Sequence, residues 1–207
     1  MKALLINGSP NEFGCTYTAL KEVEKTLNGN GIESAMLYLG RAPIAGCIAC
    51  GICRKTGRCF REDIVCKVQD SLDEYDAIVI GSPVYYAAPA GQLVCFLNRL
   101  FFAGGRLMVG KLGAAVVSCR RGGASSTFEQ INKYFTISNM PIVSSQYWNQ
   151  VHGSTPAEVV KDLEGMQTMR LLGENMAYML KAIESAKKAS IPAPKHEQRV
   201  WTNFIRE

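Results

Sequence analysis

The segment LLINGSPNEFGCTYT, residues 4–18, decides the fold, because a short apolar run passes there into a polar loop and then into a helix. The run KALLIN, residues 2–7, predicts a buried parallel strand, since strands covered on both faces are apolar throughout. Two glycines and a proline within residues 8–14 let the chain curl so that several backbone N–H groups face one hollow. A helix starting near Thr16 would aim its free N–H groups and positive dipole end at the same hollow. The segment therefore predicts a phosphate site.

Three better-known phosphate loops do not fit this segment. It contains neither the GxxxxGK[ST] pattern of nucleotide triphosphatases nor the GxGxxG spacing of dinucleotide-binding domains. A tyrosine phosphatase loop needs an arginine six residues after its nucleophilic cysteine, and the residue six after Cys15 is Lys21. Cys15 is thus a neighbour of the phosphate and not a nucleophile. The alternative that stays open is an ordinary strand–helix turn with a threonine cap.

Downstream, apolar runs alternate with segments of helical periodicity. Strands are predicted at residues 33–39, 77–81, 112–118 and 141–144, and helices at 16–27, 65–75, 91–102, 125–137 and 156–188. Five strands alternating with helices predict an α/β fold, a three-layer open parallel five-stranded sheet with helices on both faces. We expect one domain over residues 1–190, with a cysteine-rich insert at 40–65 and a C-terminal tail at 191–207.

Composition excludes several classes of protein. The chain has 207 residues, 47% hydrophobic and 20% charged, with a net charge of +5. Its basic residues are scattered, so nucleic-acid binding is not expected. No stretch approaches the roughly 18 to 20 apolar residues that span a membrane, and the apolar run at the N-terminus is too short for a signal peptide. We expect a cytoplasmic protein without a membrane partner. Large apolar residues in the tail predict burial, either across a partner subunit or on the chain's own domain.

Two further strand ends carry residues suited to a flat ring. The carboxyl ends of parallel strands meet at one edge of a sheet, so we expect these loops to converge with the first one. They supply aromatic and polar groups after the third strand, and cations and glycines after the fourth: Ser82, Pro83, Val84, Tyr85, Tyr86, Arg120, Arg121, Gly122 and Gly123. Taken singly, the tyrosines could pack at the sheet edge and the arginines could be solvated surface charges. Together with the phosphate loop they predict a flavin mononucleotide (FMN) site.

The chain resembles the NADPH-dependent FMN reductase superfamily, of flavodoxin-like fold, and within it the iron–sulfur flavoproteins. The matching segments are GSPNEFGCT (8–16), IVIGSPVYY (78–86), RRGG (120–123) and the cysteine-rich insert. The resemblance implies that five residues of the first loop hold the phosphate: Ser9, Asn11, Cys15, Thr16 and Tyr17. It implies that residues 83–86 flank the flavin ring, that Gly122 and Gly123 approach it, and that the protein is a homodimer or homotetramer. The family usually has asparagine where this chain has Cys15, which removes a carboxamide from the loop.

Four of the eight cysteines lie within thirteen residues, in the pattern CxxCxxCx5C: Cys47, Cys50, Cys53 and Cys59. Three closely spaced thiolates can surround one centre and the fourth can close it, which suits a [4Fe–4S] cluster. The spacing also matches the motif of iron–sulfur flavoproteins. Zinc accepts the same ligands, although structural zinc sites usually come as two separated knuckles. Free or redox-active thiols are the third alternative. The remaining downstream cysteines, Cys66, Cys95 and Cys119, are expected to be buried structural residues.

These observations predict an FMN-dependent oxidoreductase that passes electrons from NAD(P)H, or from reduced ferredoxin, to a small acceptor such as a quinone. No catalytic side chain is required, because the cofactor supplies the electron chemistry. His152, placed on the loop after the fifth strand, is expected either to reach the flavin or to be a surface residue. The alternative function is an electron-transfer flavoprotein, with FMN and a [4Fe–4S] cluster and no substrate of its own. A metal or redox sensor is a third.

Overall fold

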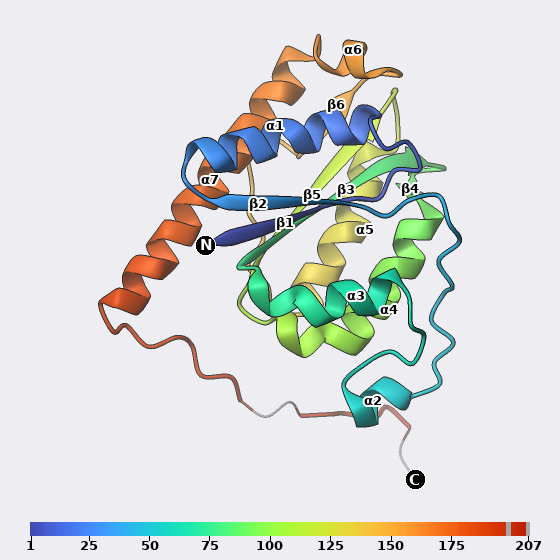
Figure 1. Cartoon of the computed structure of the whole chain (residues 1–207), viewed down its shortest axis with the longest axis vertical. Coiled ribbons are helices and arrows are strands. Elements are labelled where there is room, and N and C mark those ends of the chain that lie inside the picture. The colour runs from blue at the N-terminus through green and yellow to red at the C-terminus, as the bar shows by residue number, and fades with distance from the viewer. Residues whose placement is uncertain (198–199, 206–207) are drawn as a thin grey trace.

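The computed structural model describes residues 1–197 and 200–205 (Figure 1). Five parallel strands form the sheet in the order β2-β1-β3-β5-β6: β1 Lys2–Asn7, β2 Glu33–Tyr38, β3 Ala77–Tyr85, β5 Leu112–Cys119 and β6 Gln150–His152. A two-residue strand, β4 Ala88–Pro89, pairs antiparallel with the end of β3. This strand order is that of flavodoxin-like folds and confirms the predicted fold class.

Helices cover both faces of the sheet (Figure 1). The longer ones are α1 Cys15–Gly29, α3 Ile64–Ser71, α4 Gly91–Met108, α5 Ala124–Ile137 and α7 Leu163–Lys188. Shorter turns are α2 Ile52–Thr56, the 3-10 helix Leu72–Glu74 and α6 Pro156–Val159. The helices α1 and α7 pack on one face of the sheet, and α3, α4 and α5 pack on the other.

The three central strands β1, β3 and β5 are buried on both faces. In β1, Leu4 and Ile6 pack towards the helices α3, α4 and α5, whereas Ala3 and Leu5 pack towards α1 and α7. Successive side chains of a strand point to opposite faces, so a strand covered on both sides is apolar at every position. This explains why uninterrupted apolar runs located these three strands in the sequence.

The fifth strand was predicted at residues 141–144, and this placement is wrong. Residues 141–143 meet only the start of β5, through an isolated bridge between Ile142 and Gly113. The ladder with the end of β5 is made by β6, where Val151 pairs with Ser118. The residues between 143 and 150 leave the sheet, so the chain meets β5 twice. The apolar run at 141–144 makes the first contact, but the strand itself is formed by residues 150–152. His152 accordingly lies on β6 and not on the loop after it.

The single helix predicted over residues 156–188 is divided into α6 and α7. Asp162 stands at the division, where its Oδ1 accepts a hydrogen bond from Gly165 N (3.0 Å) and caps α7. Its Oδ2 accepts from His152 N (2.7 Å), which ties the division to β6. Apolar periodicity continues through the break, so it does not reveal a side-chain cap inside the pattern.

After α7 the described tail residues, 189–197 and 200–205, contain no helix or strand. The apolar side chains of the described tail are largely exposed, among them Phe204 at 95% and Ile205 at 81%. Burial of the tail against a partner subunit or its own domain stays a prediction. None of the helices in the described ranges combines the length and apolar character that a bilayer crossing requires.

Candidate functional site

The first loop is fastened to the sheet before it turns towards α1. Gly8 N donates to Gly81 O on β3 (2.9 Å), and a Cβ at Gly8 would lie 2.6 Å from Leu93 Cδ2. Asn7, which is buried, accepts from Ser9 N at its Oδ1 (3.1 Å) and donates from its Nδ2 to Glu12 O (2.9 Å). The sequence interpretation ended the strand at Asn7 and assigned it no role, although the structure shows that its carboxamide shapes the loop.

The loop leads into a helix end that is open to solvent. The N-cap of α1 is Gly14, which gives no side-chain cap, so the first N–H groups of the helix have no capping side chain. They border a hollow of about 480 Å³ lined by Asn11, Glu12, Phe13, Gly14, Cys15, Arg41, Ser154, Thr155 and Pro156. An uncapped helix N-terminus beside an arginine is a suitable site for a phosphate group. The residues present therefore fit the phosphate end of FMN.

Four lining residues, Arg41 and residues 154–156, were missed in the sequence. Arg41 Nε donates to Pro10 O (2.8 Å), and Tyr38 OH donates to the same oxygen (2.8 Å). Arg41 thus fixes the loop of residues 8–14 and brings a positive charge to its hollow. Both missed segments follow the carboxyl end of a parallel strand, β2 and β6, and this position was the available signal.

Three hydroxyl residues of the predicted site are buried and hold the loops in shape. Ser9 Oγ accepts from Asn11 N (3.1 Å), and Thr16 Oγ1 lies 2.8 Å from Ser118 Oγ across the α1–β5 interface. Ser82, which is fully buried, donates to Pro83 O (2.8 Å) and accepts from Ala90 N (3.0 Å). These hydroxyls serve the protein's own backbone and packing. The Ser82 hydroxyl stabilises the loop after β3, and its contact with a flavin stays a prediction.

The other predicted loop residues are accessible. Asn11 is exposed, and Cys15 and Tyr17 are half-buried. Tyr17 packs edge-on against Phe13, with ring centroids 5.2 Å apart. Cys15 donates from its Sγ to Gly153 O (3.6 Å), and burial raises the pKa of the Cys15 thiol. A neutral thiol next to the hollow agrees with the view that Cys15 is not a nucleophile.

The loops after β3 and β5 meet at the other end of the site. Tyr85 and Tyr86 are 45% and 105% exposed, and Tyr86 has a left-handed backbone with φ of 51°. Gly123 has φ of 88°, and a Cβ there would lie 2.8 Å from Ala87 Cα. Gly123 is therefore required for the close approach of the two loops. Pro83 and Val84 are half-buried, and Arg120, Arg121 and Gly122 are exposed.

His152 is held at the edge of this region. Its side chain is partly exposed, and its Nδ1 lies 3.5 Å from Asp162 Oδ2. The same carboxylate caps α7, so the imidazole is attached to a fixed structural element. Contact between His152 and a flavin stays a prediction.

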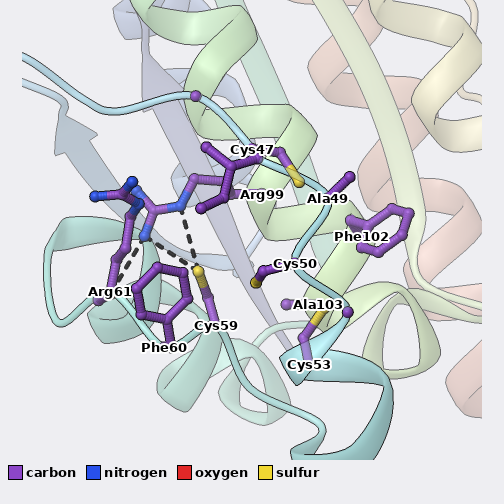
Figure 2. Close-up of a pocket in the computed structure, with 13 residues that line it drawn as sticks. Cys47, Ala49, Cys50, Cys53, Cys59, Phe60, Arg61, Arg99, Phe102 and Ala103 are labelled. Atoms are coloured by element: carbon purple, nitrogen blue, oxygen red, sulfur yellow. Dashed lines mark hydrogen bonds between the residues drawn. The ribbon is translucent and has the colours of Figure 1, made fainter.

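The four predicted metal ligands line a separate pocket beside α4. Cys47, Cys50, Cys53 and Cys59 surround a common space in Figure 2, together with Arg99 from α4. All four are unpaired thiols, two exposed and two half-buried. The free volume among them is about 30 Å³, enough for a water molecule or two.

This donor set fits a cluster in its chemistry, because four thiolates are the ligands that [4Fe–4S] clusters use. In the described ranges, no group of three or more His, Cys, Asp or Glu side chains is close enough to hold a metal ion. The four thiols nevertheless line one pocket.

The cysteine segment, which is the insert at residues 40–65, is fixed by polar side chains near its C-terminal end. Arg58 forms ion pairs with Glu62 and with Asp70 on α3. Cys66 donates to Cys59 O (3.2 Å) and is buried, as expected for a structural cysteine. Burial raises the pKa of its thiol.

Asp63 connects this segment to two helices. Its carboxylate caps α3 by accepting from Val65 N (3.0 Å) and pairs with the buried Arg99 of α4. Burial alone would raise the pKa of Asp63, but the hydrogen bonds from Arg99 and Val65 N hold it below its usual value. The carboxylate is therefore ionised at neutral pH, and it balances the charge of Arg99.

Comparison with known proteins gives a consistent family. Residues 1–154 match the family described as NADPH-dependent FMN reductase. An iron–sulfur flavoprotein of Methanocaldococcus jannaschii is 31% identical over 192 residues, covering 89% of this chain and 100% of the relative. An iron–sulfur flavoprotein of Methanosarcina thermophila is 26% identical, covering 89% and 97%. A flavodoxin structure from the domain Archaea superposes with a TM-score of 0.61 at 16% identity, covering 87% of this chain and 99% of that one, which shows the shared fold.

Proposed function

This chain belongs to the NADPH-dependent FMN reductase family, and from that premise we propose that it is an FMN-dependent oxidoreductase. It takes electrons from NAD(P)H, or from a reduced ferredoxin, and passes them to a small acceptor such as a quinone. One observation carries the proposal. The uncapped N-terminus of α1 borders an open hollow at the same sheet edge as the two contacting loops after β3 and β5.

Each end of the site has a distinct task. The first N–H groups of α1 and the cation of Arg41 would bind the phosphate, and Asn11 would add a polar contact. The exposed rings of Tyr85 and Tyr86 offer faces on which a flat heteroaromatic ring can stack. Gly122 and Gly123 let the backbone approach the ring from the other loop, and Arg120 and Arg121 place positive charge near it. When bound, FMN supplies the hydride and electron chemistry.

The test of this proposal is direct. Purified protein is mixed with FMN, and under anaerobic conditions NADH or NADPH is added, followed by a quinone. We expect bleaching of the flavin's visible absorbance by one of the two nucleotides and its recovery with the quinone. Absence of FMN binding, or bound flavin that neither a nicotinamide nor a reduced ferredoxin can reduce, would contradict the proposal.

A second candidate function is electron transfer without a substrate of the protein's own. It is favoured by the four unpaired thiols on one pocket, since thiolates of this number would hold a [4Fe–4S] cluster. Such a centre handles single electrons, whereas a nicotinamide delivers two. Anaerobic preparations assayed for iron, sulfide and flavin would show whether both groups are present. Steady turnover of NADPH with a quinone would argue against a pure carrier.

The oligomeric state expected from the sequence, a homodimer or homotetramer, is also a proposal. Exposed apolar side chains in the tail, such as Phe204 and Ile205, support it, because large exposed apolar surfaces commonly mark an interface. Light scattering of the full chain during gel filtration would measure the mass. A monomer at all concentrations would contradict the proposal. A cytoplasmic location stays a prediction.

A further inference from the structure

Arg99 is an unusual residue for the middle of a helix. Its side chain is 1% exposed, whereas the carboxylate that pairs with it, Asp63, is 33% exposed. A guanidinium stays protonated at any physiological pH, so a buried arginine needs acceptors for its N–H groups and a compensating negative charge. The acceptors of these hydrogen bonds show which part of the chain Arg99 holds in place.

Within the described residues, the side-chain hydrogen bonds of Arg99 all go to the cysteine-rich insert, residues 40–65. Both carboxylate oxygens of Asp63 accept from it, with Nη2 to Oδ1 at 2.9 Å. The carbonyl oxygens of Ala45 and Arg61 accept at 3.3 and 3.2 Å. The last acceptor is a sulfur, because Nε and Nη2 both point at Cys59 Sγ, at 3.4 and 3.3 Å. Figure 2 shows this pair of contacts at the wall of the pocket.

Two guanidinium N–H groups of Arg99 donate to one sulfur, that of Cys59, and the strength of these hydrogen bonds depends on the charge of the sulfur. A neutral thiol is a weak acceptor, whereas a sulfur that carries negative charge accepts strongly from a cation. Asp63 already balances one unit of charge. The two N–H donors aimed at Cys59 Sγ would favour negative charge on that sulfur if it served as a thiolate ligand of a cluster.

The other thiols of the pocket are placed differently. Cys47 and Cys50 are exposed and lie on a segment where Ala49 has a left-handed backbone, with φ of 53°. Cys59 alone among the four lies beneath a fixed cation, in the part of the chain that the structure describes. The pocket is thus asymmetric, with one anchored sulfur and an outer side that can adjust.

We propose that Arg99 is a positioning residue of the cysteine pocket, which fixes Cys59 and raises the reduction potential of the metal centre held there. The inference rests on the proposed presence of a [4Fe–4S] cluster. Hydrogen bonds to cluster sulfurs and nearby positive charge favour the more negative, reduced form, and so move the potential upward. Asp63 has the supporting role of orienting the guanidinium.

The experiment compares variants that keep or remove the cation. Arg99→Lys keeps a charge but loses the two-pronged geometry. The double variant Arg99→Gln, Asp63→Asn removes the charge without leaving a buried carboxylate unpaired. Arg58→Gln is the matched control, since Arg58 pairs with Glu62 and with Asp70 on α3, and none of its hydrogen bonds to described residues goes to a cysteine sulfur. Iron and sulfide per chain, the reduction potential of the cluster, and amide hydrogen exchange of residues 59–63 in the metal-free protein are measured.

We expect a shift of the potential to more negative values in the double variant, a smaller shift in Arg99→Lys, and little change in Arg58→Gln. Hydrogen exchange of residues 59–63 should become faster in both Arg99 variants, with or without metal. An unchanged potential in the double variant would overturn the tuning role, and unchanged exchange would overturn the positioning role. A wild-type protein without iron and sulfide would instead refute the cluster itself, and with it the effect on potential. If the double variant does not fold, Arg99→Lys decides by the same criteria.

Discussion

The candidate FMN site, formed by the loops after β1, β3 and β5, and the cysteine-rich insert, residues 40–65, are held in place by different means. In the candidate FMN site the loops are fixed by the sheet, through Gly8 N on Gly81 O and through the Thr16–Ser118 pair. The cysteine segment lies outside the sheet and depends on polar side chains, chiefly Arg99 from the middle of α4. A site formed by the core is set by packing over many residues, whereas a site on an insert depends on a few anchors.

The largest loss of stability is expected where β3 packs closely against α1, at Gly81. A Cβ at Gly81 would lie 2.6 Å from Leu20 Cδ1 and 2.8 Å from Thr16 Cγ2. Gly81→Ala should therefore lower the free energy of unfolding by about 1–3 kcal/mol, as overpacking does, and weaken FMN binding by moving α1. Urea unfolding and a flavin titration measure both. Gly29→Ala, with no neighbouring atom within 4 Å, is the control: it should leave FMN binding unchanged and should not lower the free energy of unfolding, because alanine is the better helix former.

The next effect concerns the buried hydroxyl pair between α1 and β5. Thr16→Val would leave the Ser118 hydroxyl buried and unpaired, at a cost of about 1–3 kcal/mol. The double variant Thr16→Val, Ser118→Ala should recover part of that loss, because both polar groups are then gone. Equal and additive losses in a double-mutant cycle would show that the two hydroxyls do not support one another.

A comparison of thiols separates the two regions by reactivity. Burial raises the pKa of Cys15 above its ordinary value of 9.0, so this thiol is protonated at pH 7. Its alkylation should be slow and should accelerate as pH rises through that raised pKa, because the thiolate is the reactive form. Cys47 is exposed and should react first. Mass spectrometry of alkylated peptides from metal-free protein measures the order, and equal rates at pH 7 would disagree with the burial of Cys15.

The smallest effect is expected at the surface ion pairs of the cysteine segment. Arg58→Ala removes contacts to Glu62 and Asp70, but all three side chains are substantially exposed, so water replaces the lost partners. Stability in urea should change little, and the iron content should be unchanged if the proposed cluster is present. A large loss of bound iron would show that surface pairs, and not Arg99, hold the segment.

The sequence predicted those parts of the molecule that follow from regular patterns. Apolar runs located β1, β3 and β5, because each is buried on both faces. Strand ends rich in Gly, Ser and Tyr located the converging loops. The sequence did not predict β6, because the chain pairs with β5 once at Ile142, leaves the sheet and returns. It also did not predict the division between α6 and α7, because the apolar periodicity continues past the Asp162 cap.

Residues that act through tertiary contacts left weaker signals. Arg41 and residues 154–156 come together only once β2 and β6 are placed at one edge. Arg99 stands in the sequence as one cation within an apolar helix, LNRLFF at residues 97–102, and its partners are 36 and 40 residues away. A charge between buried Leu97 and Leu100 was the available sign that it is buried and paired.

Titration of the protein with FMN and with riboflavin, followed by flavin fluorescence, tests most directly whether the N-terminus of α1 binds a phosphate. The two ligands differ by the phosphate alone. Charge-assisted hydrogen bonds contribute about 1.5–3 kcal/mol each, so FMN should bind at least about tenfold more tightly than riboflavin. Equal affinities for the two ligands, or no binding of either, would contradict a flavin site organised around the loop at residues 8–14.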